Sequence, residues 1–362
     1  MIHIAIGTKA QFIKMAPIMR RLQESSIAYN LIDLGQHSLI TRDLREEFGL
    51  KDPDVVLSSG QNISRLIQGI KWSSGLFLKG LDKSWVKNKV FRGSSGICLI
   101  HGDTVSTILA MYLARRAGLL VAHVEAGLRS WDCLEPFPEE LIRIITMRFS
   151  HILFAPSAWS FENLRKMGLA KRAVLLSGNT SQEASSYSLA KKAPLGLDTR
   201  DYALVTVHRM ENIFDRKRLG SVVDLVLAVS KRMPVVFVQH APTIQRLAAY
   251  GLDRRLKAAA NIKFFPILTH AQFTSLIAGS ALVITDGGSI QEECFYLDKP
   301  CLLLRRRTER MEGVGENVLV AGLDQSAAFD FLAHYREYVR KSALDEHACP
   351  SQEIVEYIKK WV

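Results

Sequence analysis

The chain has 362 residues, of which 48% are hydrophobic and 23% are charged, and its formal net charge is +11. This composition is typical of a soluble globular protein with ample core. The length predicts one large domain or, as we expect, two domains of ordinary size. No apolar run approaches the roughly 18 residues that a membrane-spanning helix needs, so we expect no such helix.

The N-terminal residues and the cysteines indicate the compartment. The stretch MIHIAIG has neither a basic flank nor a small-residue cleavage site, so we expect no signal peptide. The cysteines are odd in number and lack CxxC spacing, which predicts neither a disulfide framework nor a metal site and favours a cytoplasmic location. They are Cys98, Cys133, Cys294, Cys301 and Cys349.

The excess of 47 basic over 36 acidic residues suits a phosphorylated or nucleotide-bearing ligand, or peripheral contact with an anionic membrane. Two stretches cluster the basic side chains, KSWVKNKVFR (83–92) and the run Arg305–Arg307, and we interpret the first as a solvated surface. Because the other basic residues are scattered and no RNA- or DNA-binding motif accompanies them, we expect no nucleic-acid partner.

Short, nearly continuous apolar runs recur along the chain in two series, as is typical of parallel strands buried on both faces. The first series covers 3–7, 29–35, 97–102, 119–124 and 151–156, and the second covers 173–178, 202–208, 234–240, 262–266, 282–287 and 300–304. Amphipathic stretches between these runs predict helices over 13–24, 104–118, 157–168, 216–233 and 270–280.

This alternation of strands and helices predicts an α/β protein built from two Rossmann-like doubly wound domains that face each other across a cleft. The stretch 178–197 is polar and has the composition of a loop-rich hinge. We therefore expect an N-terminal domain over 1–177, a C-terminal domain over 178–350, and a final helix over 351–362.

The stretch GTKAQFIKMAP (7–17) joins a predicted strand to a predicted helix. A glycine-containing turn at this position leaves backbone N–H groups free to bind phosphate, and Lys9 or Lys14 would add positive charge. The motif is neither a Walker nor a GxGxxG sequence, so a glycine that serves turn geometry alone is the alternative.

Three acidic sites lie near strand and loop ends in the first half. Asp103 stands in HGDT after one strand, Glu125 follows the next strand in HVEAGLRS, and the pair Glu139–Glu140 opens a helix after Pro138. Singly, such residues cap helices or complement the helix dipole. Because ligands of open parallel sheets lie beyond the carboxyl ends of the strands, we expect the three sites to converge, as acid–base chemistry requires.

The segment TDGGSIQEE (285–293) is the most informative stretch of the second half. Gly287 and Gly288 would let a ligand approach the backbone, and the helix that begins near Ser289 would offer unpaired N–H groups to an anion. Glu293, one turn further, could accept hydrogen bonds from a ribose diol. A tight turn with ordinary capping is the alternative.

Basic residues stand at two other strand ends of this half. VTVHRMEN (205–212) places His208 beside Arg209, which suits phosphate binding or proton transfer, with a structural histidine as the alternative. Because guanidinium groups match phosphate oxygens, we expect at least one of four later arginines to be functional and the others to be surface residues. These four are Arg305, Arg306, Arg307 and Arg310.

Together, these segments resemble a known family, the UDP-N-acetylglucosamine 2-epimerases of the non-hydrolysing bacterial type. The resemblance runs through nearly the whole chain, and HVEAGLRS followed by the spaced PFPEE is its most specific part. It rests on GTKAQFIKMAP, GQH (35–37), HGDT, HVEAGLRS, PFPEE, FAPSAWSFENL (154–164), SGNT (177–180), VTVHRMEN, TDGGSIQEE and TERMEGV (308–314).

The resemblance implies a glycosyltransferase-B architecture with the active site between two Rossmann-like domains and a final helix that crosses back to the first. It implies the interconversion of UDP-N-acetylglucosamine and UDP-N-acetylmannosamine, for surface polysaccharide precursors, without a cofactor. The reaction would eliminate UDP across C1–C2 and add it back with the proton on the opposite face. The family also tends to form homodimers, so we expect one here.

Carried over residue by residue, the resemblance assigns the catalytic role to Asp103, Glu125, Glu139 and His208. It assigns the diphosphate and ribose contacts to Gly288, Ser289, Glu293 and Arg310. We expect Lys9, Lys14, Arg209 and Gly287 to complete the UDP-binding set.

The chain departs from the family at two nucleotide-side elements. The family usually begins GTRPE where this chain has GTKAQ (7–11), and it has SGG where this chain has Gly287-Gly288-Ser289. The segment SLITRDL (38–44), in the region of the family's regulatory site, also diverges. The sugar could therefore carry another substituent, for example a diacetamido or 6-deoxy hexose.

Three alternatives stay open. A hydrolysing 2-epimerase would release UDP and the free sugar. A glycosyltransferase of the same architecture would use an acceptor, with KGLDKSWVKNKVF (79–91) as its candidate binding face. A nucleotide-sugar-binding regulator would lack chemistry, although the retained carboxylates speak against it because buried acids without a role cost desolvation.

Overall fold

The structure, a computed structural model, describes residues 1–36, 38–58, 66–132, 137–191, 193, 195, 201–322, 324–342, 344 and 347–361, and within them it leaves out the side chains of 38–41, 66 and 67. His37 of GQH, Cys133, and Pro136 of PFPEE lie outside the described residues. No described helix is long and apolar enough to cross a membrane.

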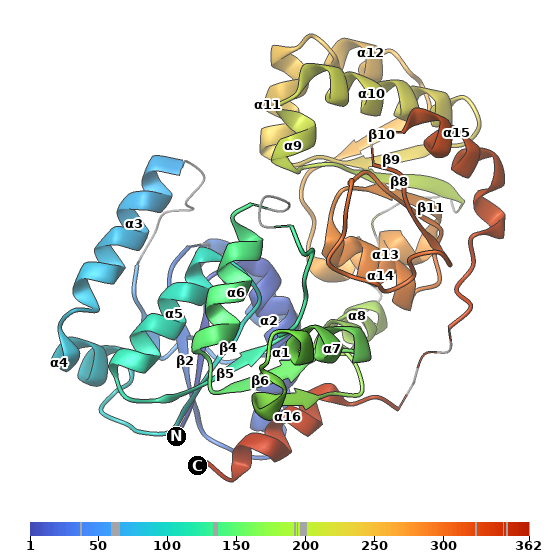
Figure 1. The fold of residues 1–362 in the computed structure, drawn as a ribbon. Coiled ribbons are helices and arrows are strands. Elements are labelled where there is room, and N and C mark those ends of the chain that lie inside the picture. The colour runs from blue at the N-terminus through green and yellow to red at the C-terminus, as the bar shows by residue number, and fades with distance from the viewer. Residues whose placement is uncertain are drawn as a thin grey trace. The chain divides into compact units, whose positions relative to one another are not determined.

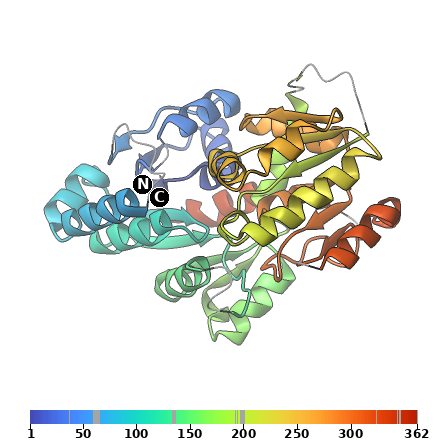
Figure 2. The same ribbon diagram turned by 90° about the horizontal axis from the view of Figure 1, so that it is seen from above.

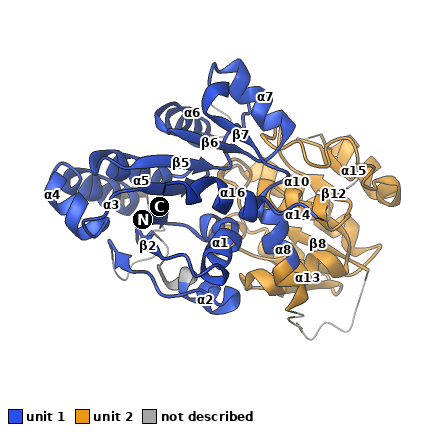
Figure 3. Cartoon of the chain, turned by 90° about the horizontal axis from the view of Figure 1, so that it is seen from below, with its two compact units in different colours: residues 1–186, 345–362 blue, residues 187–344 orange. Residues whose placement is uncertain are grey.

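The chain divides into two compact units (Figure 3). Unit 1 comprises residues 1–186 together with 345–362, and unit 2 comprises residues 187–344. Each unit is built on a parallel sheet flanked by helices (Figure 1). The predicted α/β class, with two parallel sheets, is therefore confirmed.

Seven strands in the described part of unit 1 form one sheet with the order β3-β2-β1-β4-β5-β6-β7. Their bounds are β1 Ile2–Ile6, β2 Tyr29–Asp33, β3 Val55–Val56, β4 Ile97–His101, β5 Leu120–Val124, β6 Ile152–Ala155 and β7 Ala173–Leu175. All neighbouring pairs run parallel, with Ile2 of β1 opposite both Tyr29 of β2 and Ile97 of β4. The central strands are fully buried, which explains why they read as continuous apolar runs.

The helices of unit 1 are α1 Lys9–Glu24, α2 Ser38–Phe48, α3 Leu66–Lys79, α4 Lys83–Trp85, α5 Val105–Arg116, α6 Glu139–Phe149, α7 Ala158–Lys166, α8 Thr180–Ala190 and α16 Pro350–Lys359, with short π and 3-10 turns at Val86–Val90 and Ala170–Arg172. The last helix, α16, packs on α1. Glu183 of α8 accepts hydrogen bonds from the backbone N–H of Ser351 at 2.9 Å and from its hydroxyl at 2.6 Å.

Within the part of unit 2 that the structure describes, six parallel strands form a sheet with the order β10-β9-β8-β11-β12-β13. They are β8 Tyr202–Thr206, β9 Val235–Val238, β10 Ile262–Phe265, β11 Ser280–Thr285, β12 Cys301–Leu303 and β13 Val318–Val320. The helices are α9 Met210–Ile213, α10 Arg216–Ser230, α11 Ala241–Ala249, α12 Asp253–Lys257, α13 His270–Gly279, α14 Gly288–Tyr296 and α15 Gln325–His334, followed by a 3-10 turn Tyr335–Glu337.

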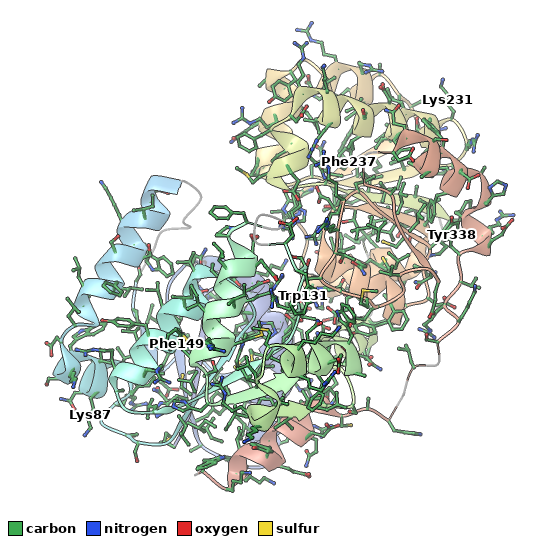
Figure 4. The ribbon with its side chains drawn as sticks, viewed as in Figure 1. Lys87, Trp131, Phe149, Lys231, Phe237 and Tyr338 are labelled. Atoms are coloured by element: carbon green, nitrogen blue, oxygen red, sulfur yellow. The ribbon has the colours of Figure 1, made fainter. Side chains whose placement is uncertain are left out.

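Apolar side chains fill both faces of each sheet. In unit 2, Phe237 of β9 lies in the core on one face, and Val236 of the same strand lies in the core on the other (Figure 4 labels Phe237). In unit 1, Ile100 and Val121 belong to the core between the sheet and α5. Alternate residues of one strand therefore serve opposite cores, as the period of two requires.

The predicted strands and helices are found at the expected positions, and two short strands, β3 and β13, were not predicted. The prediction that 178–197 is rich in loops is wrong, because α8 occupies Thr180–Ala190, although the boundary between the two units, after residue 186, falls within this stretch. The buried face of α8 consists of Ser181, Ala184, Ser185 and Ser188, at helical spacing. Small and polar residues form this face, so the segment lacks the apolar periodicity that identifies a helix.

Candidate functional site

The candidate groups of unit 1 follow neighbouring strands. Lys9 opens the helix after β1, Asp103 follows β4, and Glu125 follows β5. These three strands are adjacent in the sheet and parallel, so their carboxyl ends meet at one edge. The sheet therefore brings together side chains that are more than a hundred residues apart in the sequence.

Glu125 is the most enclosed of the predicted acids. Its side chain is 4% exposed, and its Oε1 forms an ion pair with Lys14 of α1, whose side chain is equally buried. Asn179, just before α8, donates to the same oxygen at 2.7 Å. His101 Nε2 lies 3.8 Å from Oε2. The carboxylate is thus held by a cation and an amide while one of its oxygens faces an imidazole.

The backbone after β5 is bent by residues in the left-handed region. Glu125 has φ of 66° and Trp131 has φ of 58°, which is strained for a side chain with a Cβ. Gly127 has φ of 91°, and a Cβ there would lie 2.1 Å from the Ser160 carbonyl oxygen, so glycine is required. Asn163 holds this turn, since its Nδ2 donates to the Gly127 carbonyl at 2.9 Å.

A chain of buried charges links Asp103 to α6. Arg143 forms an ion pair with Asp103 and a second one, at 3.2 Å, with Glu140. Glu140 also pairs with Arg129 and is fully buried. Asp103 remains a quarter exposed. Glu140 and the two arginines therefore fix the position of Asp103, which keeps access to solvent.

Of the pair at the start of α6, the structure buries the second glutamate rather than the first. Glu139, which the sequence assigns to catalysis, is half-buried in the first turn, whereas Glu140 is sealed between Arg129 and Arg143. Glu140 thus has the environment of a structural anchor. Glu139 keeps the partial exposure that a group needs to reach a substrate.

The prediction that the turn of residues 7–8 offers free N–H groups to phosphate is wrong. Gln11 Oε1 accepts from the backbone N–H of Gly7 at 2.8 Å and of Thr8 at 3.1 Å. The amide nitrogen of Gln11 donates to the His101 carbonyl at 2.8 Å and to Thr107 at 2.8 Å. Gln11 therefore satisfies the turn internally and fastens α1 to the end of β4. The N–H groups of Gly7 and Thr8 are thus not available to a phosphate.

Two buried imidazoles lie beneath the acids. Burial lowers the pKa of His101 and of His123 to about 4, although Glu125 and Asp103 both act in the opposite direction. The Nε2 atom of His123 lies 2.8 Å from the Gly102 carbonyl and donates to it. Both carboxylates thus raise the pKa of both rings, against the larger effect of burial.

In unit 2, a buried carboxylate that the sequence did not assign organises the predicted histidine. Asp286, fully buried after β11, accepts from the backbone N–H of His208 at 3.0 Å and of Arg209 at 2.9 Å. Asn212 adds a third donor at 3.0 Å. The His208 ring is a third exposed and stacks on His240, with centroids 4.5 Å apart. Asp286 therefore fixes the turn that carries His208 and Arg209.

The first residues of α14 lie against buried arginines. A Cβ at Gly288 would lie 3.3 Å from Arg305 Nη1 and 3.4 Å from Arg310 Nε, so the backbone approaches both guanidinium groups. Arg305 pairs with Glu309 at 3.1 Å, and Arg310 pairs with the fully buried Glu292 at 2.8 Å. The first N–H groups of a helix have no intrahelical acceptor. The helix start thus lies against two buried arginines, each of which is paired with a buried glutamate.

Two of the four arginines are exposed and two are buried. Arg305 and Arg310 are buried beside Gly288, whereas Arg306 and Arg307 are exposed. Gly287 caps α14, and the half-buried Ser289 lies in its first turn. Burial lowers the pKa of Arg305, while Glu309 acts in the opposite direction.

Glu293, in the second turn of α14, is 8% exposed. Its Oε1 lies 3.1 Å from His270 Nε2, and among the described residues its Oε2 has no hydrogen-bond partner. Buried acceptors are normally satisfied, so Oε2 is placed to accept a hydrogen bond from a ligand. No group of three or more metal-ligating side chains is present in the described residues.

Sequence reasoning missed the residues that support the candidate groups. They are Gln11, Arg129, Glu140, Arg143, Asn179, Asn212, His270, Asp286 and Glu292. Two features of the sequence could have indicated some of these supporting residues. Glu140 and Arg143 have the i, i+3 spacing of a helical ion pair, and Asp286 ends a strand immediately before two glycines.

Comparisons with known proteins agree with this geometry. The family model described as UDP-N-acetylglucosamine 2-epimerase matches residues 20–346. The UDP-N-acetylglucosamine 2-epimerase of Methanocaldococcus jannaschii is 31% identical over 335 residues, which is 88% of each chain. A UDP-2,3-diacetamido-2,3-dideoxy-D-glucuronate 2-epimerase of Pseudomonas aeruginosa is 30% identical over 331 residues, covering 87% of this chain and 86% of the relative.

Solved structures lead to the same family. The M. jannaschii enzyme in complex with UDP-GlcNAc and UDP matches with a TM-score of 0.84 and 27% identity over 99% of both chains. The UDP-GlcNAc 2-epimerase of Neisseria meningitidis, bound to UDP-GlcNAc, matches with a TM-score of 0.85 and 26% identity over 99% of both chains. These matches confirm the predicted resemblance, and the chain belongs to the UDP-N-acetylglucosamine 2-epimerase family.

Proposed function

We propose that this protein inverts C2 of a UDP-2-acetamido sugar by eliminating UDP and adding it back. The observation that carries the proposal is the buried Glu125, strained in its backbone and held by Lys14 and Asn179 at the end of β5. Two relatives of similar fold hold UDP-GlcNAc in their solved structures.

We assign proton transfer to Asp103, Glu125 and Glu139 of unit 1. The proton at C2 of the sugar is weakly acidic, so its removal needs a positioned base. As that C–H bond breaks, a double bond forms between C1 and C2 and the bond from C1 to the diphosphate oxygen breaks, which releases UDP. Re-addition reverses these changes, with a proton delivered to the opposite face of C2. Carboxylates on separate loops could serve as proton donor and acceptor on the two opposite faces of C2.

We assign UDP binding to unit 2. Developing charge on the leaving diphosphate would be stabilised by Arg310, the first N–H groups of α14 near Ser289, and Arg209 or His208. Arg305 lies beside the same helix start and pairs with Glu309. The open Oε2 of Glu293 would accept from a ribose hydroxyl. These assignments need no metal or redox cofactor, because the chemistry is proton transfer and elimination.

The substrate class is wider than one sugar. Relatives named for UDP-N-acetylglucosamine and for UDP-2,3-diacetamido-2,3-dideoxy-D-glucuronate are equally similar to this chain, at 31% and 30% identity. They share the 2-acetamido group and the nucleotide, which are the parts that the proposed chemistry uses. We therefore propose a UDP-2-acetamido hexose and leave the substituents at C3 and C6 to a substrate panel.

Deuterium exchange tests the proposal. Incubation with UDP-N-acetylglucosamine, and with the diacetamido glucuronate analogue, in deuterated water should place deuterium at C2 while UDP stays attached, as followed by NMR. Free UDP with free sugar would indicate a hydrolysing 2-epimerase. Transfer only in the presence of an acceptor would indicate a glycosyltransferase. Binding without exchange for every UDP-2-acetamido sugar would leave a binding regulator and overturn the proposal.

We further propose that the protein is a cytoplasmic homodimer that pairs through α3, α5 and α6. Figures 1 and 2 show these helices side by side on unit 1. Leu141, Ile145 and Phe149 of α6 recur at i, i+4 and i+8 and are 40%, 41% and 50% exposed. Ile70, Phe77 and Leu78 of α3 are 55%, 49% and 63% exposed. Exposed apolar side chains on neighbouring helices are typical of an interface, and a second copy would cover them. The free thiols Cys98, Cys294, Cys301 and Cys349 suit a reducing compartment.

The substitution Leu78→Glu should convert the dimer to a monomer, because it places a charge in the apolar contact. Dimer affinity should fall by about 30-fold or more, as for a central interface residue. Sedimentation equilibrium measures the change. Leu175→Glu is the matched control, since Leu175 is 50% exposed on β7, outside α3, α5 and α6. A wild-type protein that sediments as a monomer would contradict the pairing.

A further inference from the structure

Three buried side chains of unit 2 form a hydrogen-bonded row, and the first of them lies in the last turns of α8, a helix that begins in unit 1. Ser188 lies near the end of α8, His270 opens α13, and Glu293 lies in the second turn of α14. Ser188 Oγ is 2.7 Å from His270 Nδ1, and His270 Nε2 is 3.1 Å from Glu293 Oε1. Their residues are 0%, 4% and 8% exposed. Packing therefore leaves these groups little freedom to turn.

The direction of hydrogen bonding along the row follows from the chemistry of its end. An ionised carboxylate only accepts, so His270 Nε2 carries the proton and donates to Glu293 Oε1. In a neutral ring, Nδ1 then accepts, and the Ser188 hydroxyl is its donor. Ser188 thus selects the tautomer that can hold Glu293.

The row occupies one oxygen of Glu293 and leaves the other open. Among the residues that the structure describes, Glu293 Oε2 has no hydrogen-bond partner, although the residue is buried. Rotation about the last side-chain torsion of Glu293 would exchange the positions of its two carboxylate oxygens or move both of them. With Oε1 fixed by His270, Oε2 keeps one position on α14, the helix whose first turn carries Gly288 and Ser289.

We propose that His270, oriented by Ser188, is a positioning residue that aims Glu293 Oε2 at a ribose hydroxyl and so makes the protein select ribonucleotide over deoxyribonucleotide sugars. This inference rests on the proposed binding of UDP by unit 2. His270 does not touch the ligand; it acts through Glu293. Losing it leaves an unsatisfied buried oxygen and a mobile carboxylate, so the effect falls on discrimination at the ribose rather than on the diphosphate or on C2 chemistry.

Two variants of His270 separate these contacts. A glutamine amide places its nitrogen near the position of Nε2 and can still donate to Glu293, whereas an asparagine amide reaches only the position of Nδ1. We expect His270→Gln to retain the preference for the ribonucleotide and His270→Asn to lose it. His334→Asn is the matched control, because His334 is half-exposed on α15. Thermal unfolding verifies that each variant is folded, and Ser188→Ala offers a milder change in the same row.

The measurement is the dissociation constant of UDP, 2′-deoxy-UDP and 3′-deoxy-UDP by calorimetry. The wild type should bind UDP about tenfold or more tightly than at least one deoxy analogue, as expected for a hydrogen bond to a charged group. In Glu293→Gln and His270→Asn that ratio should fall towards one while binding of the same deoxy analogue is unchanged. Exchange at saturating substrate should remain at the wild-type rate in His270→Asn.

The outcomes distinguish this inference from the proposed function. If the wild type discriminates, Glu293→Gln does not, and both His270→Asn and Ser188→Ala retain the full ratio, the positioning role is overturned while UDP binding stands. If the wild type binds UDP without discrimination, the ribose role of Glu293 fails and the inference with it. If UDP does not bind at all, the proposed function itself fails.

Discussion

The substitution Glu125→Gln is expected to abolish deuterium exchange at C2 while leaving UDP affinity nearly unchanged. Glutamine keeps the size of the side chain but cannot take up the proton. Because a positioned general base contributes roughly 10²–10⁴-fold, exchange should fall by about a thousandfold. UDP affinity should persist, because Arg310, the start of α14 and Glu293, to which we assign the main nucleotide contacts, lie in unit 2. NMR exchange and calorimetric titration of UDP measure the two quantities.

This variant also removes the partner of a buried cation, and the two effects must be separated. Lys14 is 3% exposed and pairs with Glu125, so breaking the pair should cost about 3 kcal/mol of stability. The double variant Lys14→Met with Glu125→Gln removes both charges and should recover much of that loss without recovering exchange. A Glu125→Gln protein that exchanges normally would remove Glu125 from the proposed mechanism.

Acid is expected to destabilise the protein between pH 6.5 and about pH 4, well before most carboxylates are protonated. Burial lowers the pKa of His101 and His123 from 6.5 to about 4. Above pH 6.5 the rings are neutral in both the folded and the unfolded chain. As pH falls, the unfolded chain binds protons first, so stability is lost until the folded pKa is reached. Each ring contributes up to about 3 kcal/mol, a large part of a typical total.

Urea denaturation at pH 7.5 and pH 5 measures this loss. His123→Gln should reduce the pH dependence by roughly half, because the amide can still donate to the Gly102 carbonyl but does not titrate in this range. His334→Gln, on the surface of α15, should leave the dependence as in the wild type. Equal urea midpoints at the two pH values would show that the buried rings do not resist protonation.

Strand ends could be identified from the sequence because parallel strands are apolar along their whole length. Once the strands were placed, Asp103 and Glu125 stood out as acids directly after them, and the structure places them after the adjacent strands β4 and β5. Alternation alone thus locates the edge of the sheet where chemistry is expected.

The supporting contacts could not be predicted, because they join distant residues through side chains. Lys14 and Glu125 are separated by 111 positions, and nothing local marks them as a pair. Gln11 looked like a departure from the family pattern, whereas it closes the turn that was expected to bind phosphate. The helix α8 was hidden because serines form its buried face.

The order of the chain imposes an order on folding. Unit 2 is a single continuous stretch, whereas unit 1 includes residues on both sides of it. A ribosome therefore finishes unit 2 before it delivers α16, and the contacts of Ser351 with Glu183 are the last to become available. Cotranslational folding should leave the half that carries Glu125 incomplete until α16 has been made. Deletion of α16 should accordingly expose unit 1, and not unit 2, to proteolysis.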